Sequence, residues 1–162
     1  MTTADDPLFP KLEFALEVRL KLKKRLSING LPGGGDRLSV VVEEGEFEGP
    51  ALRGTVIPRG GEWPHVREDG VFCFDARYHL QEEDGTIIYL QNSGFRHAPD
   101  EVMERLWALR PGDHVSAEEY YLRAHPKFET APGKHDWLSR HVFVGVGERT
   151  EHGNRFRYYK VC

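Results

Sequence analysis

Ionisable and nucleophilic side chains alternate with apolar ones along residues 70–80, GVFCFDARYHL. Cys73, Asp75, Arg77 and His79 share one parity, and apolar residues occupy the other. Residues of one parity project from one face of a β-strand, which places the Asp75 and Arg77 side chains about 7 Å apart. Such an arginine can bind an anionic or carbonyl oxygen while the carboxylate orients it or moves a proton. Asp75 and Arg77 are therefore predicted catalytic residues, and the alternative is a buried ion pair.

A second candidate group lies in YYLRAH, where Tyr121 and Arg123 share one parity. A buried tyrosine can act as a general acid and a guanidinium can stabilise an oxyanion, although strand tyrosines also pack for structural reasons. We expect one of Tyr120 and Tyr121 to be functional and assign Tyr121 as proton donor. Trp63 lies after two glycines, so it is predicted to stack on a ligand rather than only to fold over a rim. The predicted ligand-binding residues are Arg53, Trp63, Asn92, Arg123, Trp137 and Arg140.

Motifs for metals, nucleotides and nucleophiles are missing from the sequence. The eight histidines are scattered without an HxH or HExxH spacing, and Cys73 and Cys162 are not at ligand spacing. The glycine-rich GLPGGGD lacks the phosphate-loop pattern, and no GxSxG elbow occurs. We therefore expect no metal and no cofactor, and any catalysis would rest on acid–base chemistry by side chains.

Composition narrows the class of protein. The 162 residues carry a formal charge of -4 and are 39% apolar, so we expect no nucleic-acid partner. The basic run RLKLKK alternates with leucines, which predicts a solvated strand face. No stretch reaches the roughly 18 apolar residues of a membrane span, and the acidic MTTADDPLFP does not resemble a signal peptide. Two lone thiols favour a reducing compartment, so a cytoplasmic protein is expected.

Strict alternation of apolar and polar residues in LEFALEVRLKL predicts a strand over 12–22. Asp84-Gly85 predicts a hairpin, and a two-residue turn there would pair Arg77 with Asn92 on one polar face. Helical spacing of apolar residues predicts one short helix within 99–112, PDEVMERLWALRPG. The further predicted strands are 37–47, 51–58, 70–80, 85–94, 113–125, 139–149 and 154–162.

These elements predict an all-β protein. Several strands carry polar or aromatic residues on both faces, which favours a closed antiparallel β-barrel of the lipocalin or calycin type over a sandwich, because a barrel can hold a polar-lined cavity. We expect a flexible arm over residues 1–10 and a single barrel domain over residues 11–162.

The order of several motifs adds a family resemblance. FEGPALRGTVIPRGGEWPHVREDGVFCFDARYHLQEEDG is followed by YYLRAHPKFET, HDWLSRHVFVGVGER and RYYKV. This order resembles the DUF3237 family, also called UPF0311, whose members share GxLxGxVxPGGxDW, RxDG, DxRY, DG and WLNRxxFVGxGxR. The resemblance covers roughly residues 12–161. It implies a β-barrel that is often a homo-oligomer, and it implies no settled activity.

The chain departs from the family pattern at three places. Glu62 stands directly before Trp63 in GGEWP, Ser139 occurs in WLSR, and LRAHP replaces the FRTxP segment. Each departure lies near a segment predicted to contribute to a pocket, so the substrate is expected to differ from that of relatives.

Three interpretations follow from the sequence. The first is a cofactor-free isomerase, cyclase, dehydratase or lyase acting on an aromatic or polyketide-like compound in the barrel. The second is a non-catalytic barrel that binds or carries a small hydrophobic ligand. The third is a structural role, in which the polar face is an ion-pair network and an oligomer interface dominates the surface.

Overall fold

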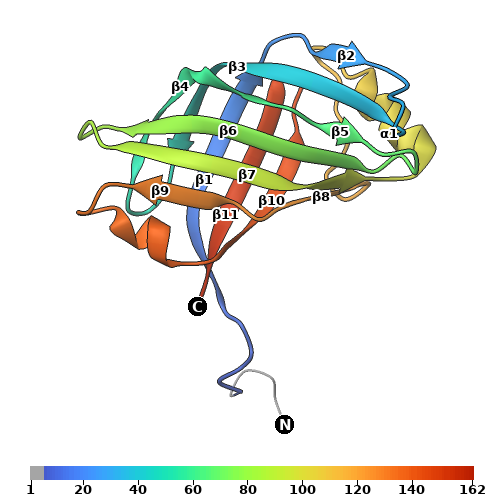
Figure 1. Cartoon of the computed structure of the whole chain (residues 1–162). Helices are drawn as coiled ribbons and strands as arrows, with labels where there is room; N and C mark the ends of the chain where they lie inside the picture. The colour runs from blue at the N-terminus through green and yellow to red at the C-terminus, as the bar shows by residue number, and fades with distance from the viewer. Residues whose placement is uncertain (1–5) are drawn as a thin grey trace.

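A ring of antiparallel strands encloses the core of the protein (Figure 1). The computed structural model describes residues 6–162. The strands are β1 (Leu12–Leu22), β2 (Leu26–Ile28), β3 (Asp36–Glu48), β4 (Arg53–Glu62), β5 (His65–Val66), β6 (Phe72–Glu82), β7 (Ile87–His97), β8 (Tyr121–Ala124), β9 (Lys127–Thr130), β10 (Phe143–Arg149) and β11 (Gly153–Val161). The helices are α1 (Asp100–Trp107) and the short 3₁₀ helix η2 (Asp136–Arg140).

Hydrogen bonding closes the ring in the order β3, β1, β11, β10, β8, β7, β6 and β4, and β4 returns to β3. The structure is thus a closed eight-stranded antiparallel barrel with one short α-helix, as the sequence predicted. β8 and β9 pair with successive parts of β7, on the same edge of that strand. The short strands β2 and β5 pair with β3. Most of the strand predicted over 113–125 is wrong, because residues 113–120 form a loop that leads into β8.

The pairing of β6 with β7 decides which side chains face inward. Asp84 and Gly85 lie in the connecting turn, as predicted, but the register pairs Arg77 with Gln91 and Ala76 with Asn92. The predicted pairing of Arg77 with Asn92 is therefore wrong by one residue, and in a strand such a shift moves a side chain to the opposite face. Asn92 is buried inside the barrel, whereas the Asp75–Arg77 parity faces outward.

Cross-strand ion pairs cover the outer surface. Arg19 contacts Glu46 at 3.4 Å, Lys21 contacts Glu44 at 3.3 Å, and Arg157 contacts Glu17 at 2.7 Å. The basic run within residues 19–24 thus contributes to a solvated strand face, as predicted. Exposed pairs of this kind each contribute only about 0–1 kcal/mol, so the fold depends on the interior.

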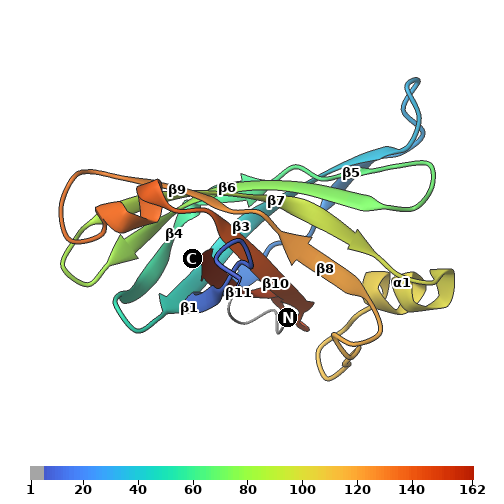
Figure 2. The same cartoon turned by 90° about the horizontal axis from the view of Figure 1, so that it is seen from below.

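The β6–β7 turn and α1 lie at opposite ends of the barrel (Figures 1 and 2). Near the β6–β7 turn, Tyr78, Leu80, Phe128, Phe143 and Tyr158 are buried, and the Phe128 ring packs against those of Phe143 and Tyr158. At the other end, α1 and the segment around β2 lie beside the opening, and Leu106 of α1 is buried. No helix among residues 6–162 is long and apolar enough to cross a membrane.

Gly94 of β7 marks a place where two strands approach closely. A Cβ atom there would lie 2.0 Å from the Arg123 carbonyl oxygen and 2.8 Å from the Phe74 ring. Gly94→Ala is therefore expected to lower the free energy of unfolding by about 1–3 kcal/mol, as overpacking in cores does. Gly33→Ala is the matched control, since nothing lies within 4 Å of its added Cβ. Urea unfolding followed by tryptophan fluorescence measures both, and equal stabilities would contradict the close packing of β7 on β8.

Candidate functional site

A cavity of about 510 Å³ opens at the end of the barrel where α1 lies. Nine of its 19 lining residues are aromatic or aliphatic, with Phe72, Phe74, Trp107 and Phe156 among them, and the other ten are charged or polar. Four of its charged or amide side chains converge from different strands: Glu62 ends β4, Arg96 lies near the end of β7, Arg149 ends β10, and Asn154 lies at the start of β11. A concave cavity in which polar side chains converge beside aromatic walls is a candidate small-molecule site.

Arg96 brings a guanidinium into this apolar end. It belongs to the inward parity of β7 and is 5% exposed, and its guanidinium carbon lies 4.2 Å from the Phe72 ring centre and 5.0 Å from that of Trp107. Its Nε has no hydrogen-bond partner within residues 6–162. Burial, together with the neighbouring positive charge of Arg149, lowers the pKa of Arg96 to about 9. The ring faces stabilise the cation, but its hydrogen-bond donors remain free for a ligand.

Glu62 supplies the acid of the cavity. It is 8% exposed, and no hydrogen bond from another described residue stabilises its carboxylate. Burial raises the pKa of Glu62, and the positive charges of Arg149 and Arg96 offset part of that rise. A carboxylate with a raised pKa is a stronger base than an exposed one, which is a property that a general base needs.

Arg149 is held in place on the opposite wall. Its Nη1 donates to the Asn154 amide oxygen at 2.8 Å and to the Gly153 carbonyl at 2.9 Å, and its backbone N–H donates to the Tyr120 hydroxyl at 2.8 Å. Burial lowers the pKa of Arg149, and its Nε has no partner among the described residues. Arg149 thus offers a second, more rigid cation to the same cavity.

A larger depression, of about 780 Å³, lies outside the barrel between the β1, β3 and β10–β11 faces and the 112–114 loop. Its charged side chains already pair with one another: Lys21 with Glu44, and Arg155 with Glu148. The interior cavity holds buried charges without such partners. We therefore take the interior cavity as the candidate site.

The structure does not place the predicted catalytic residues in that cavity. Asp75 and Arg77 form an ion pair of 3.1 Å on the outer face of β6, with side chains 43% and 52% exposed. Tyr121 is exposed on the outer face of β8, where it stacks on His97 at 4.8 Å. The expectation that these three side chains line the barrel interior is wrong, because the apolar parity of each strand faces inward. A catalytic role for them stays a prediction.

The predicted ligand-binding residues are dispersed. Arg53 pairs with Glu83 at 2.9 Å at the far end, Trp63 is exposed, and Arg140 pairs with Asp136 at 2.8 Å on the surface. Arg123 lies over the Tyr121 ring on the outside, with 5.2 Å between its guanidinium carbon and the ring centre.

Two of the predicted residues contribute to the interior. Asn92 faces into the barrel, and Trp137 packs on Phe143 at the closed end. The cavity charges Glu62, Arg96 and Arg149 were not predicted, although Glu62 stood out as a departure from the family motif. The sequence feature that could have identified Arg96 is its charge at a position on the apolar, inward face of its strand.

Fold and cavity together define a small closed β-barrel with an internal cavity, and comparisons with known proteins agree on the fold. The model of the family described as "Protein of unknown function (DUF3237)" matches residues 10–161, and the chain belongs to this family. A UPF0311 protein of Clostridium acetobutylicum is 35% identical over 127 residues, which cover 78% of each chain.

Solved structures share the same fold. A β-barrel-like protein from Acinetobacter baumannii has a TM-score of 0.82 at 29% identity and covers 98% of this chain and 99% of its own. An enzyme from Penicillium herquei has a TM-score of 0.72 at 21% identity, over 98% of this chain and 99% of its own, which shows the fold alone.

The raised pKa of Glu62 predicts a pH-dependent stability difference. An unfolded Glu62 ionises near 4.5, so the stability linked to its protonated form is fully present below that pH and lost as pH rises through the folded pKa. Glu62→Gln mimics the protonated form, so the stability advantage of the variant over the wild type should be larger at about pH 8 than at about pH 4. Urea unfolding at both pH values measures this gain. Glu129→Gln, at an exposed position, is the control. If the stability difference between Glu62→Gln and the wild type were the same at both pH values, the raised pKa of a buried Glu62 would be refuted.

Proposed function

We propose that the protein is a small-molecule enzyme that carries out acid–base chemistry in the barrel cavity on an aromatic or polyketide-like compound with an enolisable carbonyl group. The observation that carries the proposal is the presence of Glu62 and Arg96, a carboxyl and a guanidinium that are both buried and lack a direct hydrogen-bond partner, in one cavity with aromatic walls. Uncompensated buried charges destabilise a fold, so their retention favours a functional role.

The cavity supports a proton transfer at carbon. Phe72, Phe74 and Phe156 offer flat apolar walls to a ring system. The ionised Glu62 takes a proton from the carbon beside the carbonyl, and the resulting enolate oxygen accepts hydrogen bonds from Arg96 or Arg149. Return of the proton to another carbon gives isomerisation, and loss of a β-substituent gives dehydration or a lyase reaction. These steps use only side chains of this chain.

A non-catalytic role is the alternative. The same walls and the two arginines suit binding or transport of a small hydrophobic anion, and the UPF0311 relatives carry no named activity. Binding requires the cavity and the cations but not a proton-accepting Glu62. The two functions therefore differ in what Glu62 must do. The fold neighbour described as an enzyme agrees with catalysis by fold analogy alone.

Hydrogen–deuterium exchange at carbon tests the proposal without the natural substrate. In D₂O the wild type should accelerate exchange of the acidic benzylic C–H beside the carbonyl of a fused-ring ketone such as β-tetralone, with a rate that rises with pH as Glu62 ionises. Glu62→Gln and Arg96→Met should each lower the enzymatic rate by about a hundredfold or more. NMR follows the loss of the proton signal.

Matched variants separate the alternatives. Glu129→Gln and Arg59→Met remove exposed charges and should leave the rate unchanged. If Asp75→Asn abolished exchange while Glu62→Gln did not, the proton transfer would belong to the outer pair and the present assignment would fail. If naphthoate bound in an Arg96-dependent way but no ketone exchanged, the binding function would replace the enzyme. The homo-oligomer and the cytoplasmic location stay predictions.

A further inference from the structure

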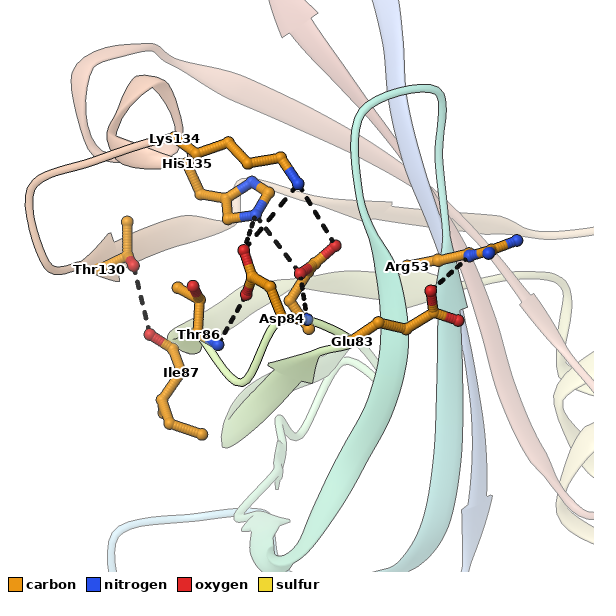
Figure 3. A network of polar contacts seen from close by, with 9 residues as sticks. Arg53, Glu83, Asp84, Thr86, Ile87, Thr130, Lys134 and His135 are labelled. Carbon is orange, nitrogen blue, oxygen red and sulfur yellow. Dashed lines mark hydrogen bonds and ion pairs between the residues drawn. The ribbon is translucent and has the colours of Figure 1, made fainter.

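A second polar cluster lies at the end of the barrel opposite the cavity (Figure 3). Glu82 ends β6, Asp84 lies in the β6–β7 turn, and His135 precedes η2. One ligand atom of each residue lies within 4.8 Å of the others. None of the three belongs to the candidate cavity, so the cluster needs its own explanation.

His135 is the unusual member. Its side chain is 1% exposed, and neither ring nitrogen has a hydrogen-bond partner within residues 6–162. Burying an unsatisfied imidazole is unfavourable. The ring points Nε2 at two carboxylates, with distances of 3.7 Å to Glu82 Oε2 and 3.6 Å to Asp84 Oδ2. Both distances exceed a hydrogen bond.

These distances suit three ligands of one ion. Ligand atoms about 2.0–2.1 Å from a tetrahedral zinc ion lie about 3.3–3.4 Å apart. Both distances from His135 Nε2 are within a few tenths of an ångström of that separation, and all three ligand atoms lie within 4.8 Å of one another. We propose that Glu82, Asp84 and His135 form a structural site for zinc or a similar divalent transition-metal cation, with water as the fourth ligand. The imidazole selects such an ion over Mg²⁺ and Ca²⁺, which prefer oxygen ligands alone.

The carboxylates are already oriented for this role. Glu82 Oε2 accepts the Asp84 backbone N–H at 2.7 Å, and Asp84 Oδ1 accepts the Thr86 backbone N–H at 2.8 Å. Two acidic ligands, one of them buried, thus face a single imidazole.

Lys134 occupies the position of a competing cation. Its Nζ lies 3.9 Å from both Glu82 Oε1 and Asp84 Oδ2, and its side chain is 65% exposed (Figure 3). The Lys134 side chain can therefore move into solvent when an ion binds. The bound ion would tie the β6–β7 turn to the loop before η2, two segments far apart in the sequence, and so stabilise the closed end of the barrel.

Zinc titration of tag-free, chelator-treated protein tests the site. Zn²⁺ at about 100 times its Kd should raise Tm by roughly 5 °C or more, whereas Mg²⁺ should leave Tm unchanged. Asp84→Asn should weaken zinc binding at least about tenfold. Lys134→Gln should tighten it by about two- to fivefold, because a competing charge is removed. Calorimetry gives the affinities.

Glu83→Gln is the matched control for Asp84→Asn. Glu83 neighbours Asp84 in the same turn but pairs with Arg53 outside the cluster, so the variant should bind zinc like the wild type. Absence of zinc binding in both the wild type and Lys134→Gln would overturn the proposal. Equal weakening by Glu83→Gln and Asp84→Asn would overturn it as well.

Discussion

Removal of Glu62 and Arg96 from water is the constraint on which the functional end of this barrel depends. The two groups line one cavity, and neither is neutralised by a direct ion pair within residues 6–162. Ring closure through β3 and β4 produces this burial, because it leaves no open sheet edge through which water reaches the interior. The apolar side chains that the strands direct inward offset the unfavourable desolvation of Glu62 and Arg96. The aromatic faces around Arg96 supply part of the solvation that its guanidinium loses.

The two ends of the barrel divide the work. The end near the β6–β7 turn is packed with aromatic rings and carries the Glu82–Asp84–His135 cluster on its periphery. The end beside α1 is left partly empty and holds the charges. A rigid end of this kind fixes the strands whose other termini carry Glu62, Arg96 and Arg149, and reactive groups on strand termini are held more precisely than groups on loops.

Much of the fold could be predicted from the sequence, because strand alternation and turn residues are local signals. The alternation in β6 identified the strand and its two faces correctly. It did not tell which face was inside, and the choice of the ionisable face placed Asp75 and Arg77 wrongly. The one-residue error in the β6–β7 register had the same effect on Asn92. A charged residue on the apolar face of a strand, such as Arg96, indicates a site better than a strand face on which all residues are ionisable.

The cavity itself could not be predicted, since it exists only where β4, β7 and β10 converge. An irregularity between Ile57 and Gly61 in β4 obscures the parity of Glu62, so its inward direction cannot be read from the sequence. The most direct test of the account is an NMR titration of the ¹³C-labelled Glu62 carboxyl in the wild type and in Arg96→Met. A pKa above 4.5 that rises further in the variant is predicted, because Arg96 favours the ionised form. A Glu62 pKa near 4.5 that is the same in the wild type and in Arg96→Met would contradict the account.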